Sequence, residues 1–183
     1  MNLIEILFSK GLNNRLTDLR PRLFRAALGL CGDAQQADDL VQVALEKALS
    51  GLHRLKQPES LEAWAFTILA NCYRDHCRRR NLEEPVQEWP DTGLPDAGEI
   101  LDAEKKVQQV RRAIGSLNPV HREVLIFVDI EDFSYAEVAD ILQIPIGTVM
   151  SRLNRGRSRL KSLLLTRTDS SLFRTKKHLE RVK

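Results

Sequence analysis

Residues 134–160 read SYAEVADILQIPIGTVMSRLNRGRSRL, and this stretch predicts two helices joined by a tight turn. Ser134 and Glu137 have the spacing of a capping box, in which each side chain accepts a hydrogen bond from a free backbone N–H at the start of a helix. The first helix should begin at Ser134 and end near Leu142, because a Gln-Ile-Pro sequence follows it. A Gly-Thr pair then opens a second helix that should run to about Leu164. This arrangement is a helix-turn-helix.

The second helix of a helix-turn-helix enters the major groove of DNA, where hydrogen-bonding side chains near its start meet base edges. The start of the predicted second helix carries hydrogen-bonding side chains, and the cationic side chains that follow them are expected to contact phosphates. The alternative is an amphipathic helix with a solvated cationic side. The residues expected to read bases are Thr148, Ser151, Arg152, Asn154 and Arg155, and those expected to meet phosphates are Arg157, Arg159 and Lys161.

Charge is distributed unevenly along the chain. The 28 basic and 25 acidic residues give a net charge of only +3 over 183 residues. Residues 152–183, however, hold 11 basic and 2 acidic residues, whereas residues 81–104 hold 8 acidic residues and no basic one. A basic segment joined to a folded domain suits a polyanion, because Lys and Arg on phosphates release condensed counterions. A solvated basic tail is the alternative.

The first half of the chain, residues 16–80, has apolar residues at helical spacing and no long alternation typical of strands. Asp33 can cap a helix that ends near Gly51. After a polar loop, Ser60 can cap a third helix, which runs into three consecutive arginines ending at Arg80. We therefore expect an all-α protein.

Residues 81–98 have the composition of a linker, with three prolines, two glycines and many acids but no apolar periodicity. Helices should resume near Ile100, and Asn118, which precedes a proline, should cap a helix that runs to about Ile130. The chain is 43% hydrophobic, which allows one modest core or two small ones. The linker favours two small domains.

The third helix of the first half carries a polar and cationic stripe opposite its apolar face. Cations interleaved with aromatic rings suit single-stranded nucleic acid, because bases stack on rings and phosphates meet arginines. Aromatic residues at helical spacing are, however, more often part of a core. The stripe consists of Thr67, Asn71, Arg74 and Arg78, with Phe66 and Tyr73 beside it.

The preceding helix carries an exposed polar strip with one apolar residue, which can dock a partner helix. Plain exposure to solvent is the simpler explanation. The strip consists of Asp39, Gln42, Val43 and Glu46.

Several classes of protein are disfavoured by the sequence. The sequence contains no run of about 18 apolar residues that could span a bilayer. Its three cysteines lack the even, spaced pattern of a secreted disulfide framework. We therefore expect a soluble cytoplasmic protein. Cys72, His76 and Cys77 do not suit a metal, because adjacent side chains on a helix point about 100° apart. The sequence has neither a nucleophile with a nearby base nor a phosphate-binding glycine loop, so we expect no enzyme activity and no cofactor.

Seven short segments, taken in their order along the chain, resemble the extracytoplasmic-function (ECF) group of bacterial sigma factors, the smallest sigma-70 relatives. The resemblance covers about residues 16–165. The segments that carry it are DA at 33–34, DLVQ at 39–42, AWAFTI at 63–68 leading through Asn71 and Asp75 to RRR at 78–80, LNPVHREV at 117–124, SYAEVA at 134–139, IPIGTV at 144–149 and SRL at 151–153.

The resemblance implies a protein that binds core RNA polymerase, directs it to promoter DNA and has an anti-sigma partner. It implies sigma region 2 at 1–80, which melts and reads the minus-10 element, an acidic linker at 81–103, sigma region 4 at 104–165, which reads the minus-35 element, and a basic tail at 166–183. It assigns polymerase binding to Asp39, Gln42, Val43 and Glu46, minus-10 binding to Arg54, Lys56, Thr67, Asn71, Arg74, Arg78, Arg79 and Arg80, and minus-35 binding to Thr148, Met150, Ser151, Arg152, Asn154, Arg155, Arg157 and Arg159.

Four positions depart from the family pattern. Met150 stands where relatives often carry Lys or Arg, so it should change which minus-35 bases are preferred rather than whether DNA binds. Gly156 replaces a frequent alanine, which costs about 1 kcal/mol of helix stability. Val43 and Leu49 replace an acid and a tryptophan in the expected polymerase contact. The alternative function is that of a freestanding helix-turn-helix regulator.

Overall fold

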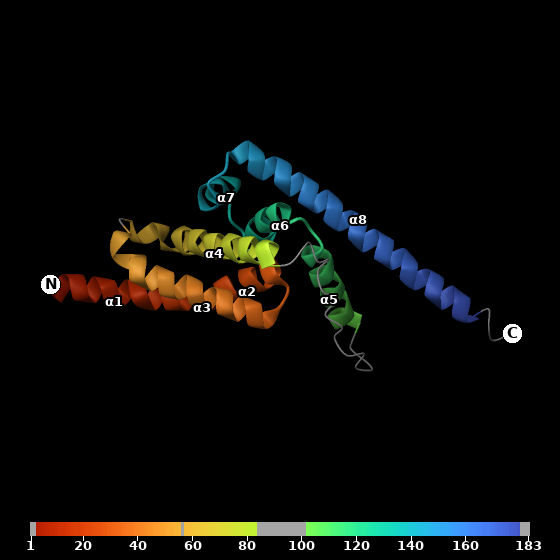
Figure 1. Cartoon of the computed structure of the whole chain (residues 1–183), viewed down its shortest axis with the longest axis horizontal. Helices are drawn as coiled ribbons and strands as arrows, with labels where there is room; N and C mark the ends of the chain where they lie inside the picture. The colour runs from red at the N-terminus through yellow and green to blue at the C-terminus, as the bar shows by residue number, and fades with distance from the viewer. Residues whose placement is uncertain (1–2, 56, 84–101, 180–183) are drawn as a thin grey trace.

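The computed structural model describes residues 3–55, 57–83 and 102–179, and every regular element within those ranges is helical, which confirms the all-α fold. Of the expected linker, residues 84–101 lie outside the described residues, and its two ends belong to the flanking helices. The elements, labelled in Figure 1, are α1 (Leu3–Asp18), α2 (Arg20–Cys31), α3 (Ala34–Gly51), the 3-10 turns η1 (Leu52–Arg54) and η2 (Pro58–Ser60), α4 (Leu61–Glu83), α5 (Asp102–Gly115), α6 (Pro119–Leu125), the π-helical turn η3 (Ile126–Ile130), α7 (Tyr135–Leu142) and α8 (Ile146–Leu179).

Local signals in the sequence determine where the helices begin and end. Gly32 ends α2 with a left-handed φ of 75°, a conformation that favours a residue without a side chain. Asp33 then starts α3, because its carboxylate accepts a hydrogen bond from the backbone N–H three residues later at 2.8 Å. Asn118 caps α6 in a similar way, and Ser134 and Glu137 form the expected capping box at the start of α7. The predicted starts of these three helices are confirmed.

Two local predictions differ from the structure. The hydroxyl of Ser60 donates to the carbonyl of Gln57 at 2.7 Å, because the residues before α4 form the 3-10 turn η2. The single helix expected up to Ile130 is regular only to Leu125 and then widens into η3, where the N–H of Glu131 bonds to the carbonyl five residues before it. Such π-helical turns are frequent at functional sites.

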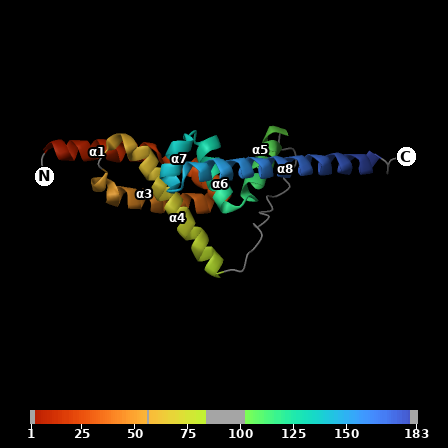
Figure 2. The same cartoon turned by 90° about the horizontal axis from the view of Figure 1, so that it is seen from above.

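Helices α1 to α4 make up the first half of the molecule. Helices α2, α3 and α4 pack against one another in chain order, and Figure 2 shows α4 crossing α3 diagonally. The apolar stripe predicted for α3 is buried at Ala37, Val41, Ala44 and Ala48. Burial of these small residues lets the neighbouring helices approach α3 closely.

Helices α5 to α8 make up the second half. Helix α8 packs against α5, α6 and α7 and extends far beyond them, as Figure 1 shows. The expected basic tail therefore begins inside this helix. Its buried residues Val149 and Leu153 fix which side of α8 faces the rest of the molecule.

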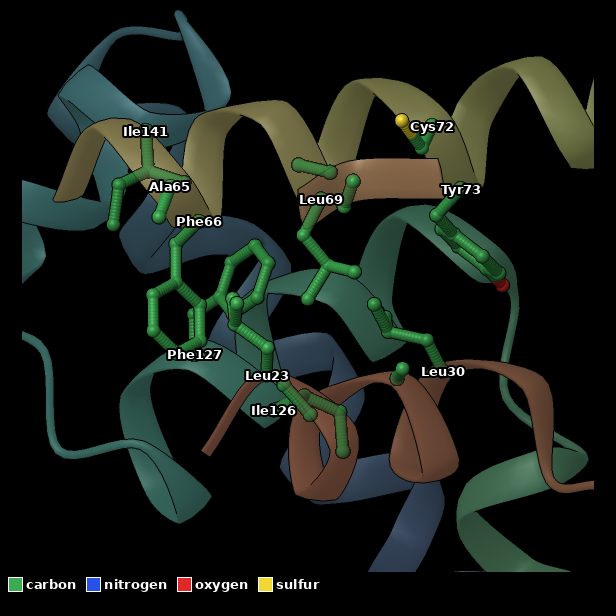
Figure 3. Close-up of a cluster of buried hydrophobic side chains, with 14 of the residues drawn as sticks. Leu23, Leu30, Ala65, Phe66, Leu69, Cys72, Tyr73, Ile126, Phe127 and Ile141 are labelled. Carbon is green, nitrogen blue, oxygen red and sulfur yellow. The ribbon is translucent and has the colours of Figure 1, made fainter. Parts of the chain in front are cut away.

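The buried side chains of the two halves form one continuous cluster, although the sequence favours two separate cores. Phe66 of α4 lies edge-on to Phe127 and to Phe133 of the second half, with ring centroids 5.9 Å and 4.8 Å apart. Figure 3 shows Ile126 and Phe127 between α2 and α4, beside Leu23. In this conformation the two halves are packed together.

Candidate nucleic-acid interface

The start of α8 is held in place by the turn that joins it to α7. Gln143 adopts a left-handed φ of 53°, and its N–H bonds to carbonyls in the last turn of α7. The carbonyl of Pro145 then accepts a hydrogen bond from the N–H of Thr148 at 2.8 Å, which closes the first turn of α8. Val149 and Leu153 are buried, so the rotation of α8 about its axis is fixed.

The side of α8 opposite these anchors is polar, cationic and open to solvent. Ser151 lies opposite the anchors, and Met150, with 48% of its surface exposed, lies at the edge of this open side. Ser151 donates its hydroxyl hydrogen to the carbonyl of Thr148 at 3.0 Å, which leaves the oxygen lone pairs available to another partner. Of the residues expected at the minus-35 element, Met150, Ser151, Asn154, Arg155, Arg157 and Arg159 are exposed, and Thr148 and Arg152 are half-buried.

Two contacts support this surface from behind. The guanidinium of Arg157 is bound by the carboxylate of Asp129 on η3, with 3.1 Å between Nε and Oδ2. Gly156 is buried against α6, where an added Cβ would lie 3.4 Å from the carbonyl oxygen of His121. Burial lowers the pKa of His121, and the charges of Arg155 and Arg152 lower it further. The imidazole beside the cationic surface is therefore neutral at pH 7.

The stripe expected on α4 is only partly open. Asn71, Arg78 and Arg79 are exposed, and Arg54 is exposed on η1. Thr67 is half-buried and its hydroxyl bonds to the carbonyl of Ala63. Lys56 lies outside the described residues, and so does the side chain of Arg80.

Arg74 is the member of this stripe that the structure places most differently. Its Nε and Nη2 each lie 3.1 Å from a carboxylate oxygen of Glu123 on α6, and Nη1 and Nη2 lie 3.3 Å from the carbonyl oxygen of Leu142 on α7. In this conformation Arg74 is therefore bound by the second half of the chain and is not free to meet a nucleic acid.

The aromatic residues beside the stripe are part of the core. Phe66 is fully buried and Tyr73 is 3% exposed, so neither offers a face to a base. Together with Leu69 they recur at spacings of three and four, the period of the apolar face of α4. The alternative interpretation of these aromatics, as core residues, is confirmed.

The strip expected to bind polymerase lies on the outer face of α3. Asp39, Gln42, Val43 and Glu46 are all exposed, and the side-chain amide of Gln42 donates to Glu46 at 3.1 Å. One turn beyond, Leu49 is 48% exposed. The strip is therefore polar with two apolar residues that the described part of the chain leaves uncovered.

Five charged residues at the contact between the halves were not anticipated from the sequence. Arg122 and Glu123 lie in the LNPVHREV segment that carries the family resemblance, but the only signal of their role in this contact is that they and Glu131 interrupt an otherwise apolar stretch that the structure buries. The other two belong to α2, where Arg22 is half-buried and Arg25 is exposed. The five are Arg22, Arg25, Arg122, Glu123 and Glu131.

None of the helices in the described ranges combines the length and the apolar character needed to cross a membrane.

Two family models match the chain. The model for sigma-70 region 2 matches residues 16–83, and the model for sigma-70 region 4 matches residues 107–160. Together they cover more than half of the chain, in the order expected from the sequence motifs.

Two relatives and one solved structure agree with these matches. The chain is 38% identical over 146 residues to the ECF RNA polymerase sigma factor EcfG of Rhodopseudomonas palustris (strain TIE-1), covering 79% of this chain and 80% of that protein. It is 32% identical over 136 residues to the RNA polymerase sigma factor HrpL of Pseudomonas syringae pv. syringae, covering 70% and 73%. Its fold is similar to that of the sigma factor RpoE in complex with the anti-sigma factor NepR from Bartonella quintana, with a TM-score of 0.72, 32% identity, and coverage of 85% of this chain and 97% of that one.

Proposed function

Because the chain belongs to the ECF group of the sigma-70 family, whose members direct RNA polymerase to promoters, we propose which of its surfaces reads each promoter element. The open side of α8 reads the minus-35 element as duplex DNA. The exposed part of α4 and the η1 loop read the minus-10 element. The outer face of α3 binds core RNA polymerase.

The observation that carries the minus-35 assignment is the exposed start of α8. Helix starts that present donors and acceptors over two turns fit the major groove. Ser151 and Arg155 are one turn apart and exposed, so both can reach base edges of adjacent base pairs. Arg157 and Arg159 lie further along, toward the phosphates, although Asp129 binds Nε and Nη2 of Arg157 in this conformation. Met150 supplies an apolar contact that suits the methyl group of a thymine.

The minus-10 assignment is supported by Asn71, Arg78 and Arg79, which are exposed on one stretch of α4, and by Arg54, which is exposed on η1 before that helix begins. An amide can hydrogen-bond an unpaired base, and the arginines suit the phosphates of a single strand. Arg74 joins this surface only when it is released from Glu123. Thr67, Lys56 and Arg80 belong to the same proposal.

The proposal makes the chain a binding factor and not an enzyme. It locates the protein in the cytoplasm, where core polymerase and promoters are. It also includes an anti-sigma partner, because the similar sigma factor RpoE was solved in complex with one.

Run-off transcription with purified core polymerase tests the function directly. We expect the chain to program core polymerase to start at a discrete site, and to bind duplex DNA poorly on its own. Arg155→Ala should reduce transcripts from promoters that need a minus-35 element, and Asn71→Ala should impair opening at the minus-10 element. Arg111→Ala, at another exposed arginine, is the matched control.

The alternative of a freestanding regulator makes the opposite prediction. It requires tight binding to duplex DNA without polymerase and no transcript with it. Full activity of both variants on the chain's own promoter would contradict the residue assignments.

A further inference from the structure

A carboxylate lies beside the proposed minus-35 surface and holds one of its arginines. Oδ2 of Asp129, on η3, accepts a hydrogen bond from Nε of Arg157 at 3.1 Å, and Oδ1 accepts a second one from Nη2. The side chain of Asp129 is 29% exposed and that of Arg157 is 51% exposed. A carboxylate at this place is unexpected, because the phosphates of duplex DNA carry the same sign of charge.

The turn that carries Asp129 is fixed by the core beneath it. The N–H of Glu131 bonds to the carbonyl of Ile126 at 3.0 Å, which closes η3 around Asp129. Ile126 and Phe127, in the same turn, are fully buried. The carboxylate therefore projects from an anchored turn, and a part of the chain outside α8 sets the direction of the Arg157 side chain.

The geometry of this ion pair leaves the outer edge of the guanidinium for another partner. An arginine has five N–H groups, and Asp129 accepts from the one on Nε and from one on Nη2. Asp129 raises the pKa of Arg157 most strongly, and the hydroxyl of Tyr135 at the start of α7 raises it further. The edge formed by Nη1 and Nη2 points away from Nε, and two donors on such an edge match two oxygens of a phosphate.

The place of Arg157 on α8 also suits a phosphate. It follows Met150 by two helical turns and therefore lies on the same edge of the open side. Since α8 begins at Ile146, Arg157 lies about 17 Å along the helix, beyond the residues expected to read bases. In a helix-turn-helix the residues near the start of the second helix reach base edges, and those further along meet the sugar-phosphate backbone.

We propose that Asp129 is a positioning residue for minus-35 recognition: it holds Arg157 so that the outer edge of the guanidinium binds a DNA phosphate and fixes the register of α8 in the major groove. The inference rests on the proposed function, since it requires that the open side of α8 meets duplex DNA. A phosphate contact carries no sequence information, but it determines where the base-reading side chains lie. Asp129 therefore affects promoter recognition without touching DNA.

Two effects of Asp129 on DNA binding oppose each other. Its charge repels phosphates, but Arg157 neutralises that charge and salt screens what remains at a partly exposed site. In its favour, the two hydrogen bonds restrict the rotamers of Arg157 before DNA arrives, so less side-chain entropy is lost on binding. The second effect exceeds the first, and removing this negative charge should weaken DNA binding. Simple electrostatics predicts the opposite.

The first experiment tests the ion pair in the free chain, without DNA or polymerase. A hydrogen-bonded N–H exchanges with water more slowly than a free one. The Nε–H signal of Arg157, identified by its loss in Arg157→Ala, should exchange about fivefold faster in Asp129→Asn. Equal exchange rates in the wild-type chain and in Asp129→Asn would show that the carboxylate does not hold the guanidinium, and would overturn the inference.

The second experiment measures binding of the holoenzyme, made from core polymerase and the full chain, to a duplex fragment of the promoter that gives the strongest run-off transcript. Asp129→Asn should weaken this binding about fivefold, because the guanidinium is no longer fixed. Asp140→Asn removes another exposed carboxylate of the same half and should not weaken it. Asp129→Glu keeps the carboxylate and should restore most of the affinity, which a general loss of charge or of folding would not allow.

Arg157→Ala tests whether Asp129 acts through this arginine. Alone it should weaken binding about tenfold and reduce the slope of log K against log salt concentration by about one, as expected for the loss of one phosphate contact. In the Arg157→Ala background, Asp129→Asn should strengthen binding, because only the repulsion is left to remove. Equal weakening by Asp129→Asn in both backgrounds would overturn the positioning role, and an unchanged salt slope in Arg157→Ala would overturn the phosphate contact.

The two proposals fail in different ways. A wild-type holoenzyme that transcribes from the promoter, together with an Asp129→Asn holoenzyme that binds it as tightly or more tightly, would refute the role of Asp129 and leave the proposed function intact. A wild-type chain that gives no transcript with core polymerase would contradict the proposed function, and the inference about Asp129 would fall with it.

Discussion

Replacing Arg122 with lysine should destabilise the folded chain more than any exposed charge substitution. The guanidinium is 3% exposed and donates to five acceptors. Within the second half it bonds to the carbonyls of Ile114, Gly115 and Leu117, which end α5 and precede α6. Carbonyls at the C-terminus of a helix lack a partner within the helix, although that of Ile114 also accepts a hydrogen bond from the N–H of Leu117 at 3.0 Å.

The remaining two bonds of Arg122 cross to the first half. Nη1 lies 2.7 Å from the carbonyl oxygen of Leu30 at the end of α2 and 3.2 Å from the hydroxyl oxygen of Tyr73 on α4. The tyrosine is held neutral, because burial raises the pKa of its hydroxyl. One side chain therefore ties together the ends of two helices and the side of a third.

The expected loss in the free energy of unfolding follows from counting the acceptors that Arg122→Lys leaves without a donor. The carbonyl of Ile114 keeps its hydrogen bond from the N–H of Leu117, and lysine has three donors on one nitrogen, so Arg122→Lys leaves at least one of the other four buried acceptors without this partner. Such a group costs about 1–3 kcal/mol, so the free energy of unfolding should fall by about 1–3 kcal/mol. That is a large share of the about 5–15 kcal/mol that stabilises a typical domain.

Urea unfolding followed by circular dichroism measures the effect, with the exposed Arg111→Lys as control. In a thermal melt, at about 2–4 °C per kcal/mol, the melting temperature should fall by about 2–12 °C. A loss of less than 1 kcal/mol would refute the reasoning, because the carbonyls would then be satisfied without the guanidinium.

Three further predictions concern stability and use the same urea assay. Ser134→Ala should lower the free energy of unfolding by about 1 kcal/mol, because it removes the side-chain acceptor of the capping box. Gly156→Ala should raise the free energy of unfolding by up to about 1 kcal/mol, because alanine favours a helix more than glycine does and the added Cβ makes only an ordinary contact of 3.4 Å with His121. A loss of stability would show that the contact between α6 and α8 cannot accommodate the added Cβ. Burial raises the pKa of Glu123 in the folded chain, so just above the ordinary pKa of 4.5 the folded state binds more protons than the unfolded state. The wild-type chain should therefore gain stability relative to Glu123→Gln as the pH falls toward 4.5. A difference in stability that does not change with pH would contradict this.

The features that could be predicted from the sequence are those encoded by residues close together in the chain. Asp33, Asn118 and Ser134 each begin a helix because their side chains bond to backbone N–H groups two or three residues later. The open side of α8 is equally local, since burial of Val149 and Leu153 leaves the polar residues on the other side. These features need no knowledge of what lies across the core.

The remaining features depend on contacts between distant residues. Apolar periodicity shows which side of α4 is buried, but not that Phe66 meets Phe127 and Phe133 of the other half. In the same way, Arg74 satisfies every sequence criterion for an exposed cationic stripe, and its position is decided by Glu123, 49 residues away. Pairing of this kind has no signature in a single sequence.

Arg74 also shows why one residue fits both a nucleic-acid contact, as the sequence predicts, and an ion pair within the chain, as the structure shows. A guanidinium presents its donors as a planar fork that matches a carboxylate and a phosphate equally well. The same guanidinium that is proposed to meet a phosphate can therefore be held by a carboxylate of the chain, as Glu123 holds Arg74 here. Glu123 is the carboxylate that meets Arg74, whereas Glu131 is bound by Arg22 and Arg25 of α2. A single sequence therefore does not decide which partner Arg74 meets, because a carboxylate and a phosphate accept the same pair of donors.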